Sequence, residues 1–130
     1  MSRNPGRPLS PHLTIWKWGP HMLVSILHRA TGVSMALGAV SIFVWWLAAA
    51  ASGPQPYETF LSWVTWWPGY VVAIGFTWTF FQHMFSGIRH LVLDTGAGYE
   101  LRVNKMGAVA TMTGSITMTA LVWALILARH

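Results

Sequence analysis

Three long stretches without a charged side chain constrain this sequence more than any other feature. Residues 30–57, 59–88 and 106–128 contain no Asp, Glu, Lys or Arg. Each is longer than the roughly 20 residues that an α-helix needs to cross about 30 Å of hydrocarbon. An α-helix also satisfies its backbone hydrogen bonds within itself, as a segment in lipid must. The sequence therefore predicts an all-α membrane protein with three transmembrane helices.

The composition agrees with this prediction and excludes several other classes. Of the 130 residues 54% are hydrophobic and 8% are charged, against roughly 25% charged in soluble domains. The net charge of +5 comes from scattered Lys and Arg beside the apolar runs, so we expect contact with lipid and none with nucleic acid. Cysteine is absent, which excludes disulfides, iron–sulfur ligation by this chain and covalent c-type haem. We expect one membrane-anchor domain of residues 1–130.

Turn-forming residues and charges set the expected helix limits and the orientation. We expect helices at about 21–51, 62–93 and 106–128, separated by loops that contain Gly and Pro. The first loop carries Glu58 and no basic residue, whereas five basic residues lie on the other side of the membrane: Arg3, Arg7, Lys17, Arg102 and Lys105. The positive-inside rule therefore places the N-terminus in the cytoplasm. No apolar run follows the first arginines as in a cleaved signal peptide, and a bacterial inner membrane is the simplest location.

Ionisable groups occur within two of the expected spans and at matching depths. His28 and Arg29 lie near the start of the first span, and His83 and His90 lie near the end of the second. Because these two helices run in opposite directions, both sets fall in the same layer, on the cytoplasmic side. Ionisable groups at membrane depth are costly and usually mark functional sites.

His83 is the first candidate for a ligand of haem b. Gly87, one turn further along, leaves bare backbone beside it, which would admit a flat and bulky ligand. The alternative is a histidine that forms a hydrogen bond between helices. His90 projects from the same side of the helix as His83, so the two cannot bind opposite faces of one iron. A second ligand would come from His28 or from a partner chain, and we favour the partner.

The remaining polar groups have two interpretations each. His90 and Arg89 would contact haem propionates; the alternatives are that both reach the membrane interface or that they pair with Asp94. Ser25 and Arg29 share one helix face and would donate hydrogen bonds to a quinone carbonyl, where Arg29 stabilises negative charge. The alternative for Arg29 is contact with a lipid phosphate or a partner carboxylate.

Three motifs in chain order resemble the cytochrome b subunits of succinate dehydrogenase: Arg7-Pro-Leu-Ser-Pro-His-Leu-Thr-Ile15, Ser25-Ile-Leu-His-Arg-Ala-Thr-Gly32 and His83-Met-Phe-Ser-Gly-Ile-Arg-His-Leu-Val-Leu-Asp94. The resemblance covers nearly the whole chain, and the second and third motifs together are specific. It implies a membrane anchor of complex II, in which a flavoprotein subunit oxidises succinate and an iron–sulfur subunit carries electrons to the membrane. The anchor and a second hydrophobic anchor subunit would bind ubiquinone and one haem b between them.

The resemblance also implies a role for each polar residue. The position of His83 is that of an axial haem ligand, whose counterpart comes from the second anchor subunit. Ser25 and Arg29 match residues of the quinone pocket, and His28 and His90 match residues near the haem propionates. Such an anchor holds no catalytic residue and is not an enzyme alone. The alternatives are an anchor of a quinol:fumarate reductase, because the reaction is reversible, and a structural or transporter-type membrane protein without haem.

Overall fold

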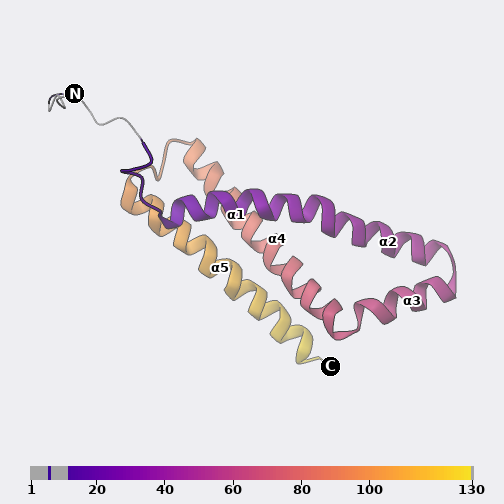
Figure 1. The fold of residues 1–130 in the computed structure, drawn as a ribbon. Helices are drawn as coiled ribbons and strands as arrows, with labels where there is room; N and C mark the ends of the chain where they lie inside the picture. The colour runs from indigo at the N-terminus through magenta and orange to yellow at the C-terminus, as the bar shows by residue number, and fades with distance from the viewer. Residues whose placement is uncertain (1–5, 7–11, 130) are drawn as a thin grey trace.

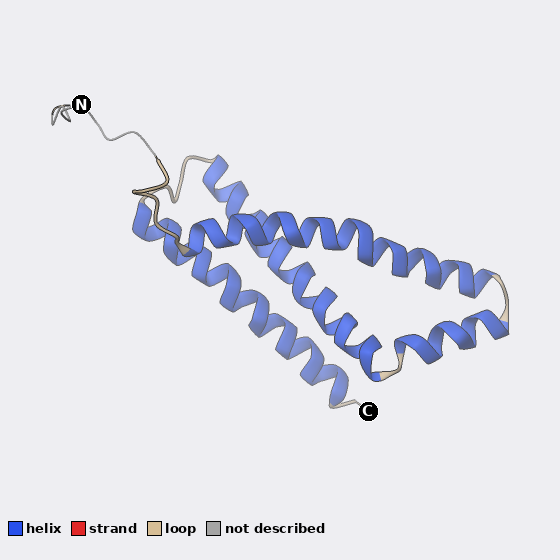
Figure 2. Ribbon diagram, in the orientation of Figure 1, coloured by secondary structure: helices blue, strands red, loops and turns tan. Residues whose placement is uncertain are grey.

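The computed structural model describes Gly6 and residues 12–129. In this part of the chain every regular element is a helix, as Figure 2 shows. The all-α prediction is therefore confirmed. The elements are α1 (Pro20–Ser34), the π-helix η1 (Met35–Ala39), α2 (Val40–Ala51), α3 (Pro54–Val64), α4 (Trp67–Asp94) and α5 (Leu101–Leu127).

Three helical stretches are long and apolar enough to cross a membrane. They are Pro20–Ala51, which runs through α1, η1 and α2, then Trp67–Asp94 and Leu101–Leu127. This confirms the three expected spans and a multi-pass membrane protein. In Figure 1 the start of α1, the end of α4 and the start of α5 lie together at one end of the molecule, near the N-terminus. The α2–α3 hairpin projects at the other end.

The segment between the first two spans differs from the expectation. Most of the expected loop at about 52–62 is the separate helix α3, and the second span begins at Trp67 and not at 62. Pro54 is the first residue of α3 and Pro68 the second residue of α4. Proline is tolerated in a first helical turn, where its missing N–H would have no intrahelical partner. Pro54, in the stretch that we expected to be a loop, therefore begins a helix here, and Pro68 lies in a first turn.

The third span also begins earlier than expected, at Leu101 and not at 106. The absence of charge marks only the part of a helix that lies in hydrocarbon. Arg102 and Lys105 belong to the same helix before that part begins, and both are exposed. The loop between α4 and α5 is shorter as a result.

The helices pack through small and hydroxyl-bearing side chains. α4 makes its largest contact with α5 and the next largest with α1. Buried hydroxyl groups bond to carbonyls of their own helix, as Thr111 does to Ala108 and Thr119 to Ser115. Small side chains allow close approach of helices in lipid. The buried residues of these three helices are Val24, Thr31, Thr79, Gln82, Ser86, Ala108, Thr111, Ser115 and Thr119.

Ala30, Ser34 and Gly38 are small residues one helical turn apart on the first span, and only part of this row contacts another helix. Ala30 and Ser34 are exposed in this chain. Gly38, within η1, does meet a neighbour, because a Cβ built there would lie 2.5 Å from Cζ of Phe76 in α4. The aromatic ring of Phe76 thus occupies the space that a side chain at Gly38 would need.

Candidate functional site at the histidine cluster

Three histidines from two helices meet at the end of the molecule where α1 begins and α4 ends. The imidazole rings of His28 (α1) and His83 (α4) stack, with centroids 4.0 Å apart and planes at 10°. The ring of His90 lies edge-on to that of His28, at 5.1 Å and 62°. All three side chains are half-buried. The two polar sets that the sequence places in one membrane layer are therefore in direct contact.

The hydrogen bonds of His83 define which of its ring nitrogens carries the proton. Nδ1 lies 3.1 Å from the backbone carbonyl oxygen of His28 and 3.2 Å from Oγ1 of Thr31. The Thr31 hydroxyl donates to the Leu27 carbonyl at 2.7 Å. Because a carbonyl only accepts, Nδ1 of His83 is the donor, and in the neutral imidazole Nε2 then keeps a free lone pair. A histidine held in this way is oriented to bind a metal through Nε2.

The side chain of His28 forms a hydrogen bond to α4, as the side chain of His83 does to α1. Its Nδ1 lies 2.7 Å from Oγ of Ser86, and Oγ of Ser86 also lies 2.7 Å from the Gln82 carbonyl oxygen. The Ser86 hydroxyl has one proton, so the bond to His28 runs either from Nδ1–H of His28 to Ser86 or from Ser86 to an unprotonated Nδ1. The polar chain continues to α5, because Oγ of Ser115 donates to Oε1 of Gln82 at 2.7 Å. These bonds link α1, α4 and α5 around the histidines.

Replacement of Ser86 by Ala should destabilise the subunit. Ser86 is fully buried, so the change leaves Nδ1 of His28 without its hydrogen-bond partner and should lower the free energy of unfolding by about 1–3 kcal/mol. A thermal melt of the purified protein in detergent would measure the loss. Ser34→Ala is the control, because that hydroxyl is exposed and bonds only to the Ala30 carbonyl of its own helix. A melting temperature equal to that of the wild type would contradict a supporting role of Ser86.

Two glycines, Gly32 and Gly87, lie next to the imidazole rings of His83 and His28. A Cβ at Gly32 would lie 3.0 Å from Cε1 of His83, so Gly32 allows α1 to approach that ring closely. A Cβ at Gly87 would meet only Cε1 of His28, at 3.8 Å. A side chain at Gly87 would therefore make an ordinary van der Waals contact with the His28 ring, and the approach of a flat ligand at this position stays a prediction.

Sequence reasoning assigned no function to Thr31, Gly32 or Ser86. All three lie within the quoted motifs, three or four residues from His28 or His83. This spacing places them on the same helix faces as the histidines. This spacing is the signal by which the sequence alone could have pointed to these three residues.

Ser25 and Arg29 lie beside His28 on α1, three residues before it and one after it, but do not bond to the histidine cluster. Ser25 is half-buried and Arg29 is exposed. Neither side chain forms a hydrogen bond or ion pair with another residue in the part of the chain that the structure describes. A guanidinium within a membrane span requires a polar partner, so a ligand, lipid or another subunit would have to provide it.

Arg89 links two helices. Its Nη2 donates to Oδ1 of Asn104 in α5 at 2.7 Å, and its Cδ and Nε would each lie 3.7 Å from a Cβ at Gly107. The expected alternative of an ion pair with Asp94 is wrong for the described residues, because Arg89 extends toward α5 instead.

Comparison with known proteins identifies the family. The profile of the family described as "Succinate dehydrogenase/Fumarate reductase transmembrane subunit" matches residues 3–125. The chain belongs to this family. Residues 7–11 of the first quoted motif lie outside the described part of the structure.

Curated relatives of this transmembrane subunit have matching names. The chain is 34% identical over 116 residues to the succinate dehydrogenase cytochrome b556 subunit of Paracoccus denitrificans, with 88% of each chain covered. It is 37% identical over 120 residues to the protein of the same name in Rickettsia conorii, with 90% of each covered. It is 34% identical over 124 residues to the mitochondrial cytochrome b560 subunit of succinate dehydrogenase from Sus scrofa, covering 88% of this chain and 71% of the relative. The resemblance found from the motifs is thereby confirmed.

Proposed function

We propose that this chain is the haem b- and ubiquinone-binding membrane anchor of a succinate:ubiquinone oxidoreductase in a bacterial inner membrane. It would assemble with a flavoprotein subunit, an iron–sulfur subunit and a second hydrophobic anchor subunit, and would have no activity alone. The observation that carries the proposal is the fixed orientation of His83. Its Nδ1 bonds to the His28 carbonyl at 3.1 Å, so its Nε2 is left free for iron.

The residues around His83 fit a haem. Bound haem b would supply an iron that accepts and releases one electron. His83 would provide one axial ligand, and His28 and His90 would provide donors for the propionates. The rings of His28 and His83 stack face to face at 4.0 Å, an arrangement that does not fit two ligands on opposite sides of one iron. This supports a second ligand from the other anchor subunit.

Ser25 and Arg29 would bind the quinone. Their side chains lie four residues apart on α1, about one helical turn, and have no partner among the described residues. The Ser25 hydroxyl and the Arg29 guanidinium can donate to one quinone oxygen. Arg29 would stabilise the negative charge that this oxygen gains when the quinone accepts electrons.

A quinol:fumarate reductase anchor is the second candidate, because the family description includes both enzymes. The curated relatives favour the first candidate. Those reported above, at 34–37% identity, all carry the name of succinate dehydrogenase.

An optical difference spectrum of the wild-type complex tests the proposal. The chain would be purified with its co-purifying partners, and the dithionite-reduced spectrum would be compared with the oxidised one. We expect a b-type haem band together with succinate–ubiquinone reductase activity. An intact complex without such a band would overturn the cytochrome assignment and leave a structural anchor without haem.

A further inference from the structure

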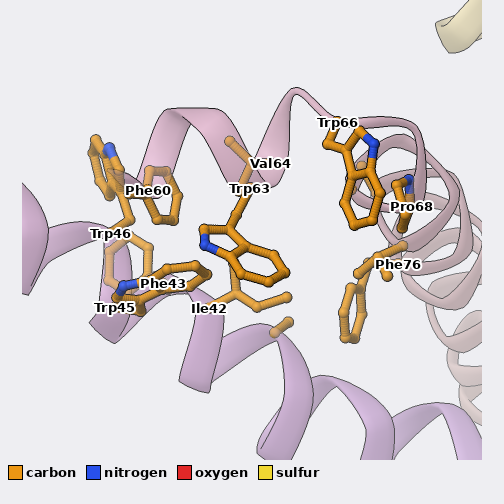
Figure 3. Close-up of a pocket in the computed structure, with 14 residues that line it drawn as sticks. Ile42, Phe43, Trp45, Trp46, Phe60, Trp63, Val64, Trp66, Pro68 and Phe76 are labelled. Atoms are coloured by element: carbon orange, nitrogen blue, oxygen red, sulfur yellow. The ribbon is translucent and has the colours of Figure 1, made fainter. Parts of the chain in front are cut away.

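A second site lies at the other end of the molecule from the histidines. Residues of η1, α2, α3 and the first half of α4 enclose a pocket of about 600 Å³, shown in Figure 3. Its 14 lining residues include no charged side chain. The only side-chain polar atoms among them are the indole nitrogens of Trp45, Trp46, Trp63 and Trp66.

The pocket exists because the first span is not a continuous α-helix. The π-helix η1 (Met35–Ala39) inserts a wider turn between α1 and α2, and such turns bend helices and often occur at functional sites. Beyond it α2 diverges from α4, as Figure 1 shows. α3 closes the far end of the space between α2 and α4. There the ring of Phe60 packs against that of Trp45, with centroids 4.9 Å apart.

The orientation of α3 places the pocket beneath a membrane surface. Phe60, Trp63 and Val64 face the pocket. Gln55, Glu58 and Ser62 lie on the opposite face of α3, which is typical of a helix at the membrane interface, and all three are exposed.

The pocket mouth has the chemistry of a lipid interface. Tryptophans at this level usually direct their indole N–H groups toward lipid headgroups. The indole groups of Trp45, Trp46, Trp63 and Trp66 make no hydrogen bond within the described part of the chain. Residues 52–66 carry Glu58 and no Lys or Arg. Nothing in this segment would attract an anionic headgroup, whereas a carboxylate complements an amine.

We infer that this pocket binds one acyl chain of a zwitterionic phospholipid such as phosphatidylethanolamine. The volume lies in the range of about 300–1,000 Å³ that small-molecule sites have. The apolar walls would contact the chain, and the indole N–H groups would donate to ester or phosphate oxygens. The proposal is independent of haem and quinone binding. Its failure would leave the histidine cluster unaffected.

Photolabelling of the wild-type complex in its own membrane tests the site. The probe is phosphatidylethanolamine with a diazirine on one acyl chain, and labelled peptides would be mapped by mass spectrometry. We expect label concentrated in residues 39–46 and 60–76. Label spread evenly over the exposed faces of α2 would show surrounding lipid only and overturn the site. Equal labelling by a phosphatidylglycerol probe would overturn the headgroup assignment, and displacement of the probe by ubiquinone would overturn the lipid assignment.

A pocket-filling variant provides the second test. Ala73 lines the pocket, so Ala73→Phe should reduce labelling about tenfold, the loss expected when roughly two buried methylene groups lose their place. Ala48→Phe is the matched control. Ala48 is exposed and does not line the pocket, so its change should leave labelling as in the wild type. Undiminished labelling of the assembled Ala73→Phe complex would overturn the proposal, and Ala39→Leu would replace that variant if it failed to assemble.

Discussion

His83→Ala is expected to remove the b-type haem band of the purified complex or to shift it. The substitution removes the only imidazole at this site whose Nδ1–H donates to a backbone carbonyl of the neighbouring helix. An iron that loses an axial ligand changes its spectrum even where the haem is retained. The reduced-minus-oxidised spectrum would be recorded together with the haem content per flavin.

Two further histidine variants make this result specific. His12 is exposed and bonds to Thr14, two residues away, so His12→Ala should leave the band unchanged. His28→Ala removes a ring but keeps the backbone carbonyl that orients His83, so the iron should remain bound. Loss of the band in His28→Ala but not in His83→Ala would show that the ligand is His28.

Arg29→Ala is expected to lower succinate–ubiquinone reductase activity by about 10²–10³-fold, the usual effect of removing one donor to a developing oxyanion. Oxidation of succinate by an artificial dye should continue at the wild-type rate, because that reaction does not require the quinone site. Both rates would be measured on the same preparation. An equal loss of both would show that Arg29 only supports the structure.

Two arginine variants separate charge from geometry. Arg29→Lys keeps the positive charge but loses the planar pair of donors, so it should have intermediate quinone reductase activity. Arg129→Ala changes an exposed arginine after α5, at the other end of that helix from the histidine layer, and should have no effect on either activity. A loss in Arg129→Ala as large as that in Arg29→Ala would indicate a general response to lost positive charge.

The three spans were predictable because they follow from the absence of charge, which is a local property of the chain. α3 was not predictable in the same way. Pro54 and Pro68 each break a helix or begin one, according to whether their position lies in a first turn. The local sequence alone does not decide between these outcomes.

The depth of the site in the membrane was predictable from the sequence, but the contacts between its side chains were not. The rise per residue places His28 and His83 in one layer without knowledge of how α1 rotates against α4. The stacking of the two rings depends on that rotation, which the close approach at Gly32 and the bond from His28 to Ser86 hold in place. The position of Arg29 on the exposed side of α1 depends on the same rotation.

The bond from His83 to the His28 carbonyl has a consequence for the order of assembly. The acceptor belongs to the main chain of α1, so no side-chain replacement at position 28 removes it. In a chain whose first and second spans have not yet met, the imidazole of His83 would exchange its proton freely between the two nitrogens. Docking of the spans would fix the proton on Nδ1. Under the proposed function, haem would therefore meet an oriented His83 only after the two spans have docked.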